Sequence, residues 1–430
     1  MPLTLHTAPP RPRVRCGRSA LLACALWPLV ATVAHADVVT DWNVTAIRAA
    51  STIGISTGVQ SRLMALTHAA MFDAINSIER KYTPYAIEVI PPTDASAEAA
   101  AVTAAHGVLM QLVPDEQKML DTALATTLAK VADGPAKEAG AALGREVAAK
   151  MVERRRADGL DATVVYTPGT TPGAWQPTPP AFRAAALPHF GAVTPFVLTS
   201  SDQFPMPGPP ALTSEVFARD LQEIQAAGAR RGSSRTAEQS EVAIFWTVWT
   251  YMPFNAAARA AAAQRDLSLV DSARLLALLN LAGVDSQIAC WHWKYQFNFW
   301  RPITTIRTAA STQTAAPTAD ANWESLLVTP AHPDYPSGHA TYGGAAAEVL
   351  RAVLGDDRVD ASFTWPEPGG ITRTYASFSQ MDREIIDARV WGGIHFRQTD
   401  EDSSALGRQI GNYTVQTWLR PVSGTPAAAH

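Results

Sequence analysis

Apolar residues recur along most of this 430-residue chain at the spacing of one helix face. Few stretches show the strict alternation that is expected of half-buried strands. The predicted helical stretches are residues 41–49, 61–78, 96–112, 115–131, 135–156, 238–252 and 266–300. A further helix is expected to begin near residues 212–215, where Thr213 or Ser214 can act as its N-cap. The chain is therefore predicted to be all-α, a helical bundle around a packed apolar core.

The first 36 residues have the composition of an export signal. Four arginines between residues 11 and 18 precede an apolar stretch at 19–33, and Ala34-His35-Ala36 fits a small-x-small cleavage site. We expect the mature chain to begin near Asp37 and to be exported, either to the periplasm or out of the cell. Residues 37–430 are predicted to form a single α-helical domain.

The mature chain carries few signs of a membrane, a disulfide or a nucleic-acid partner. No run after residue 36 reaches about 18 uninterrupted apolar residues, so no membrane span is expected. Cys290 is the one cysteine left after cleavage, which excludes an intramolecular disulfide and predicts a buried, inert thiol. The formal net charge of −4 gives no indication of nucleic-acid binding. Homo-oligomerisation is left open.

Eleven prolines fall within residues 166–210. A connection of this length is usually functional or irregular, because most loops in compact domains are far shorter. The favoured interpretation is a surface segment. The alternative is an arm that wraps a neighbouring subunit or forms a wall of the binding pocket.

Three short segments carry the chemistry, and the second is the sequence Pro-Ser-Gly-His at residues 336–339. Ser337 is placed to cap a helix, whose free N–H groups and positive dipole end bind anions. Gly338 lets an anion approach the backbone closely, and His339 would stand beside it as an acid or base. Alone, this segment is better explained as a simple capped helix start.

The first segment, residues 294–302, holds two cations in an aromatic surrounding. Lys294 and Arg301 are seven residues apart, close to two helical turns, so both can lie on one helix face. Buried cations need a partner, and no acidic residue lies between them. A bound anion would neutralise them, and salt bridges to distant carboxylates are the alternative.

The third segment places Arg389 six residues before His395, with Gly392 and Gly393 between them. The two glycines allow a turn that could bring both side chains to one point. The alternative is an ordinary helix–loop–helix with a surface arginine. The occurrence of all three segments in this order favours a pocket for a tetrahedral oxyanion such as phosphate or vanadate.

Together these segments resemble the vanadium-dependent haloperoxidases and the related type 2 phosphatidic acid phosphatases and bacterial acid phosphatases. The shared pattern is K-x6-RP, PSGH and SR-x5-H, and this chain departs from it only in having Ala388 before Arg389. The match lies within residues 291–406. Residues 41–43 and 69–76 also resemble the secreted bacterial branch of the haloperoxidases. The resemblance implies an all-helical fold with the site inside a helix bundle.

The resemblance also implies a role for each residue in the pattern. Vanadate would be the cofactor, with His395 as its nitrogen ligand and His339 as the acid–base group. The remaining residues would bind the vanadate oxygens: Lys294, Arg301, Ser337, the Gly338 N–H and Arg389. Vanadium would act as a Lewis acid that polarises hydrogen peroxide for attack by a halide, giving hypohalous acid. An organic acceptor is a further potential partner.

Two positions bear on which halide is oxidised. His332 precedes His339 by seven residues, where the family's algal bromoperoxidases have His and its chloroperoxidases tend to have Phe. This favours bromide or iodide, whereas Trp291 resembles the chloroperoxidase type. His332 could equally be an ordinary loop histidine. Family members often have Asp four residues after the ligand histidine; here Thr399 stands there and Asp400 follows, so the carboxylate that orients His395 is not identified.

Two other functions fit the same residues. An exported acid phosphatase could use the pocket with His395 as a nucleophile that forms a phosphohistidine. A non-enzymatic helical protein could have kept the pocket without the chemistry. Phosphate and vanadate share shape and charge, so the motif does not separate an oxidase from a phosphatase.

Overall fold

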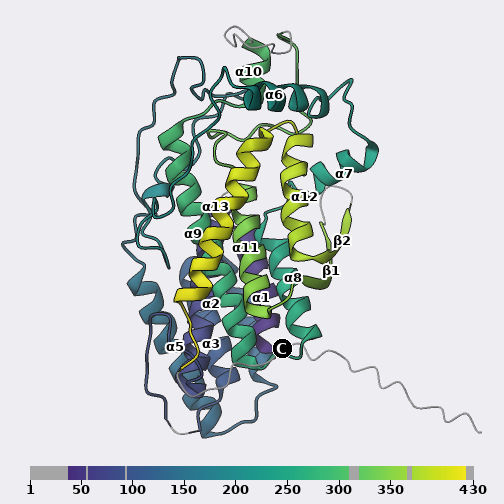
Figure 1. The fold of residues 1–430 in the computed structure, drawn as a ribbon. Helices are drawn as coiled ribbons and strands as arrows, with labels where there is room; N and C mark the ends of the chain where they lie inside the picture. The colour runs from purple at the N-terminus through teal and green to yellow at the C-terminus, as the bar shows by residue number, and fades with distance from the viewer. Residues whose placement is uncertain (1–36, 55–56, 93, 309–318, 366–369, 423–430) are drawn as a thin grey trace, which may run out of the picture. The chain divides into compact units, whose positions relative to one another are not determined.

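The computed structural model describes residues 37–54, 57–92, 94–308, 319–365 and 370–422 (Figure 1). The predicted export signal, residues 1–36, lies outside the described residues. The α-helices are α1 (Val38–Ser51), α2 (Thr57–Glu79), α3 (Ala97–Leu112), α4 (Gln117–Leu128), α5 (Pro135–Arg154), α6 (Glu215–Ala227), α7 (Ala237–Phe245), α8 (Tyr251–Gln264), α9 (Leu269–Phe297), α10 (Pro302–Thr308), α11 (Gly338–Leu354), α12 (Phe378–Trp391) and α13 (Arg397–Thr417). Two 3-10 helices, η1 (Pro114–Glu116) and η2 (Phe190–Ala192), and two strands, β1 (Arg358–Thr364) and β2 (Thr372–Ser377), complete the described structure. The predicted helical fold class is confirmed.

The predicted helix starts are observed where a side chain caps the helix. Ser96 accepts a hydrogen bond from the Ala99 N–H at the start of α3, and Ser214 accepts one from the Phe217 N–H at the start of α6. Each cap satisfies a backbone donor that the first helical turn leaves free.

Three details of the predicted secondary structure are wrong. The expected helix over 238–252 is broken after Phe245, and α8 begins at Tyr251. The expected helix over 266–300 ends at Phe297, because Asn298 adopts the left-handed conformation with φ 51°. Strands β1 and β2 pair as an antiparallel hairpin that the helical spacing did not predict.

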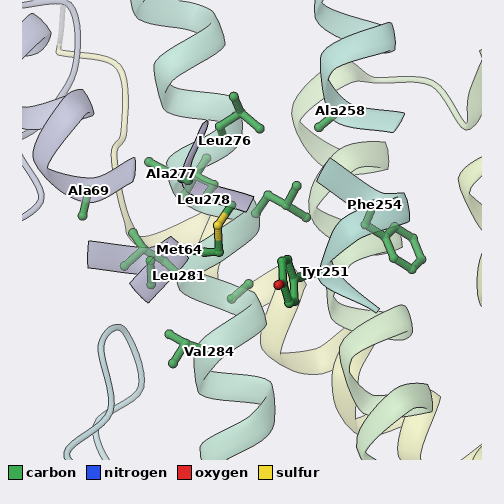
Figure 2. Close-up of a cluster of buried hydrophobic side chains, with 14 of the residues drawn as sticks. Met64, Ala69, Tyr251, Phe254, Ala258, Leu276, Ala277, Leu278, Leu281 and Val284 are labelled. Atoms are coloured by element: carbon green, nitrogen blue, oxygen red, sulfur yellow. The ribbon is translucent and has the colours of Figure 1, made fainter. Parts of the chain in front are cut away.

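Helix α9 runs through the core and packs against α2, α8, α11 and α13. Nearly all of its residues from Leu275 to Trp291 are buried, so the helix shows no polar face. Figure 2 shows side chains of α2, α8 and α9 that belong to one buried apolar cluster, with Met64, Phe254 and Leu278 among them. Full burial of one such side chain contributes about 1.5–3 kcal/mol, so this core fixes the position of the C-terminal end of α9.

Glycines let α11 and α13 approach each other closely. A Cβ on Gly344 would lie 2.2 Å from the Ser404 carbonyl oxygen, and a Cβ on Gly407 would lie 2.1 Å from that of Thr341. Any side chain at either position would therefore push the two helices apart. This contact holds the start of α11 beside the start of α13.

Two expectations about the mature chain agree with the structure. Cys290 is fully buried in α9, and burial raises the pKa of its thiol, as expected for an unreactive cysteine. Among the described helices, none combines the length and the apolar character needed to cross a bilayer.

The Pro-rich segment 166–210 is irregular apart from η2, and it is anchored to α9. The buried carboxylate of Asp285 accepts three backbone hydrogen bonds from this segment, donated by Phe196, Val197 and Leu198 at 2.7–2.8 Å. Further along α9, the Tyr295 hydroxyl donates to the Ala186 carbonyl at 2.6 Å. These bonds fix an otherwise irregular chain against the helix that carries Lys294.

A buried polar network links α1, α2, α8 and α9. Asn43 lies 2.8 Å from Nε2 of His68 and donates to Asn255, which in turn pairs with Asn280. His68 is fully buried, and burial lowers its pKa to about 3, with the nearby Arg259 adding to the effect. The ring is therefore neutral in the folded protein at pH 7.

We expect His68 to make the protein sensitive to acid. Its folded pKa of about 3 lies below the ordinary value of 6.5, so the unfolded chain binds more protons between these pH values. The contribution of the neutral ring is complete above pH 6.5 and is lost as the pH falls toward 3. In urea unfolding from pH 7 to 4.5, His68→Gln should flatten the decline of the unfolding free energy by up to about 1.4 kcal/mol per pH unit.

The matched control is His106→Gln, at a histidine that contacts the half-exposed Asp121. Parallel pH profiles for the parent and His68→Gln would contradict the prediction.

Candidate active site

A pocket of about 430 Å³ opens where the C-terminal ends of α9 and α12 meet the start of α11. Gly338, His339, Arg389 and His395 line it, together with His332 and Trp291. Other walls come from Arg183, Ala186 and Leu187 of the Pro-rich segment and from Thr247 and Trp249 between α7 and α8. The pocket lining thus includes residues of the second and third sequence segments.

Lys294 and Arg301 reach the site from different elements, so the expected common helix face is wrong. Lys294 lies in the last turn of α9, and the left-handed Asn298 turns the chain before Arg301, which immediately precedes α10. Both side chains are fully buried. Burial lowers the pKa of Lys294 to about 8 and that of Arg301 to about 10, so both remain cations at pH 7.

The partners of these two cations are mainly backbone carbonyls. The Lys294 ammonium donates to the carbonyls of Pro333, Asp334 and Pro336. Arg301 donates to the carbonyls of His332 and Ile394, at 2.8 and 2.6 Å. These bonds orient the cations without neutralising them. Neither residue is among those that line the pocket. Both lie behind its lining residues and contact their backbone carbonyls or those of their neighbours.

The start of α11 supplies three adjacent polar groups. Ser337 occupies the predicted N-cap position, but its hydroxyl caps no backbone N–H. The hydroxyl lies near enough to Asp400 to lower the pKa of that carboxyl, yet it makes no aligned hydrogen bond. A Cβ on Gly338 would lie 3.0 Å from the Trp291 ring, and the buried Nε2 atom of the half-buried His339 has no hydrogen-bond partner.

Arg389 and His395 come together as the glycine spacing predicted. Arg389 lies in the last turn of α12, Gly393 has φ +75°, and the Ile394 N–H donates back to the Arg389 carbonyl at 3.2 Å. Arg389 donates to the Trp246 carbonyl at 2.9 Å through one terminal nitrogen, while its Nε is buried without a partner. His395 and Arg389 both line the pocket.

All three pocket histidines are neutral at pH 7. Burial lowers the pKa of His332, His339 and His395 well below 6.5. The neighbouring cations act in the same direction, because a second positive charge beside Arg301 or Arg389 is unfavourable. Each ring therefore keeps one nitrogen lone pair that can accept a proton or coordinate a metal.

Two buried carboxylates balance the three cations only in part. Asp334 approaches Arg301 to 3.8 Å, and burial raises its pKa to about 7. Asp400 has neither oxygen hydrogen-bonded, and burial raises its pKa well above the usual value despite the nearby Arg389. The pocket keeps an excess of positive charge, which a bound anion would neutralise.

The two residues with opposite halide implications are in contact. The rings of Trp291 and His332 lie 5.2 Å apart at an angle of 50°. Nδ1 of His332 lies 2.9 Å from a terminal nitrogen of Arg301, so His332 is tied to the cation cluster. His332 lies in the loop before α11, with its ring held against Arg301 and Trp291.

Comparison with known proteins gives the same assignment for the fold and the motif region. Residues 274–424 match the family model of the vanadium chloroperoxidase second helical-bundle domain. A bacterial vanadium-dependent iodoperoxidase has a similar structure, with a TM-score of 0.76 and 27% identity, and the match covers 90% of this chain and 98% of that one. The chain belongs to the vanadium haloperoxidase family.

Other haloperoxidases are similar over shorter stretches or in fold alone. The vanadium chloroperoxidase of Curvularia inaequalis is 28% identical over 200 residues, 40% of this chain and 33% of that protein. The vanadium-dependent bromoperoxidase of Ascophyllum nodosum is 52% identical over 103 residues, 21% of this chain and 18% of that protein. The matches thus span a third or less of these two curated relatives. An apo-type bacterial vanadium-dependent chloroperoxidase shares the fold, with a TM-score of 0.71 at 19% identity over 85% of this chain and 94% of that one.

The haloperoxidase motif does not contain every residue that builds this site. Asp334 was not anticipated, although a charged residue two positions before Pro336 in a buried motif was a signal that could have revealed it. Trp249 and Arg183 lie far from the motif in sequence and were also missed. The Pro-rich segment forms part of the pocket wall, so the alternative interpretation holds over that of a plain surface segment.

The site of this haloperoxidase relative fits a tetrahedral oxyanion. Three polar atoms that could meet an anion lack a partner, namely Ser337 Oγ, Arg389 Nε and His339 Nε2, whereas the other unpaired atoms of the site are oxygens of Asp334 and Asp400. Buried donors left unpaired cost about 1–3 kcal/mol each, so groups of this kind indicate a missing ligand. With the unbalanced positive charge, they suit an anion that accepts several hydrogen bonds.

Proposed function

We propose that this protein is a vanadate-dependent haloperoxidase that oxidises bromide or iodide with hydrogen peroxide to hypohalous acid. One observation carries the proposal. His395, a neutral imidazole, shares a pocket with buried unpaired polar groups and with three cations at or behind its wall. Bound vanadate would supply the Lewis acidity that polarises peroxide toward attack by the halide.

The chain's own residues have distinct roles in this proposal. His395 presents a lone pair to the metal, because burial and the neighbouring cations keep its ring neutral. Arg389, Ser337 and the Gly338 N–H hold the oxyanion oxygens, and Lys294 and Arg301 stabilise its charge from behind. Nε2 of His339 is free to take a proton from peroxide as it binds and to return it later. The low exposure of these groups strengthens each electrostatic contact.

Bromide or iodide as the substrate is supported by His332 and by two relatives. His332 contacts both Trp291 and Arg301 at the pocket wall, where a halide would approach. The similar structure with the highest identity reported above is an iodoperoxidase, and the relative with 52% identity is a bromoperoxidase. A halide anion would be attracted by the excess positive charge of the pocket.

The test is a pair of assays on one sample of residues 37–430, stripped of oxyanions and divided into portions with and without orthovanadate. We expect bromination of an indicator by bromide and peroxide only in the vanadate-loaded portion, with little hydrolysis of an aryl phosphate. Iodide and chloride run in parallel rank the halides, and chloride should be the poorest. Hydrolysis that vanadate inhibits, without bromination, would identify the acid phosphatase alternative.

Export remains part of the proposal. It rests on the basic and apolar character of residues 1–33 and on the Ala34-His35-Ala36 site. Recovery of the chain outside the cytoplasm, with Asp37 as its first residue, would support it, and an intact N-terminus would contradict it.

A further inference from the structure

Asp334 makes contacts that the functional roles above leave unused. It is fully buried in the loop that directly precedes α11. Its Oδ1 lies 3.0 Å from Nδ1 of His395, and its Oδ2 accepts a hydrogen bond of 2.6 Å from the Thr399 hydroxyl. Its backbone N–H donates to the Phe299 carbonyl at 2.8 Å, and its own carbonyl accepts from Lys294. The Thr399 hydroxyl thus holds the carboxylate, and the contacts with Phe299 and Lys294 hold the backbone of Asp334.

We infer that Asp334 is the carboxylate that positions His395 for its ligand, and that Thr399 holds Asp334 in place. Oδ1 of Asp334 receives no aligned hydrogen bond, so it remains available to the imidazole. A carboxylate beside Nδ1 favours the tautomer that carries its proton there. Nε2 then keeps the lone pair, and a histidine held in this way coordinates a metal more strongly.

This arrangement relocates the orienting carboxylate from the start of α13 to the loop before α11. Thr399 stands in the first turn of α13, where its neutral hydroxyl donates a hydrogen bond to Asp334. Asp400, the next residue, has Arg389 and Arg397 among the cations that lower its pKa, and neither of its oxygens is hydrogen-bonded to His395. The two carboxylates therefore serve different members of the site.

The inference rests on the proposed function and can be tested by binding alone. Asp334→Asn removes a negative charge, so simple electrostatics predicts that every oxyanion binds more tightly. Loss of positioning predicts the opposite for vanadate, because the asparagine amide can donate to Nδ1 and favour the wrong tautomer. Phosphate, which needs no bond to His395 in order to bind, serves as the internal reference.

We would measure dissociation constants for vanadate and phosphate by calorimetry on the parent, Asp334→Asn, Thr399→Val and Asp402→Asn. Asp402 is the control, because this carboxylate of α13 accepts a hydrogen bond from Tyr335, the neighbour of Asp334, at 3.0 Å without contacting His395. We expect Asp334→Asn to weaken vanadate binding about 10- to 100-fold, since outer-shell partners have effects of that size. Phosphate binding should be unchanged or tighter. Thr399→Val should shift the same ratio less, and Asp402→Asn should leave it unchanged.

Two results would overturn the inference about Asp334, and a third would overturn the proposed function. An Asp334→Asn variant that binds vanadate as tightly as the parent contradicts the positioning role. If that variant does not fold, an unchanged vanadate-to-phosphate ratio in Thr399→Val contradicts it equally. A parent that binds vanadate no more tightly than phosphate overturns the proposed function itself, whatever Asp334 does. The chemical shift of bound vanadium in the parent and in Thr399→Val provides a readout that a purely structural role would not change.

Discussion

Replacing His395 with alanine is expected to abolish vanadate binding or to weaken it by more than about 100-fold. The change removes the only side chain proposed to bond directly to the metal, so the loss should exceed the 10- to 100-fold effect of an outer-shell partner. Burial and the adjacent Arg301 hold the pKa of His395 well below its usual range, so its lone pair is available without the loss of a proton. Equilibrium dialysis with vanadate at pH 7 measures the effect.

A histidine that lies outside the pocket provides the control. His292 lies in α9, contacts Ser201 at 3.2 Å and is absent from the pocket lining. His292→Ala should bind vanadate as the parent does. A His395→Ala variant that binds vanadate as tightly as the parent would show that the assigned site is wrong.

Replacing His339 with alanine should separate binding from turnover. We expect vanadate affinity to stay within about tenfold, because the cations and the start of α11 remain in place. Turnover should fall about 10²- to 10⁴-fold, the range that a positioned acid–base group contributes. The reason is the free Nε2 of a ring that burial and Arg389 keep neutral, which makes it a base ready to accept a proton.

The measurement is kcat at saturating vanadate, with the vanadate dissociation constant determined on the same sample. Unchanged turnover would exclude an acid–base role for His339. Loss of turnover in proportion to lost vanadate would instead assign His339 to binding.

The parts of the site that the sequence predicted are those that short-range rules control. Ser337 and Gly338 mark a helix start because of their own backbone preferences. Arg389 and His395 converge because Gly393 adopts a positive φ and turns the chain within a few residues. In such cases the residues that decide the geometry lie inside the motif itself.

The parts that were not predicted depend on contacts between distant segments. The apolar pattern runs on through Phe299 and Trp300, so only the left-handed Asn298 reveals that α9 has ended. Asp334 contacts Thr399 and His395 because α11 packs against α13, which brings together segments about 60 residues apart in the sequence. Strands β1 and β2 are only seven and six residues long, and the alternation of Val359, Ala361 and Phe363 in β1 was a strand signal that the helical interpretation missed.

The course of the Pro-rich segment 166–210 has a consequence for how this enzyme class can diversify. The oxyanion contacts are fixed by helix ends, whereas one wall of the entrance is irregular chain tied down by Asp285 and Tyr295. Irregular chain accepts insertions and substitutions that packed helices do not. The entrance can therefore be remodelled while the oxyanion contacts stay unchanged, and residues 183–187 are the place to begin such a redesign.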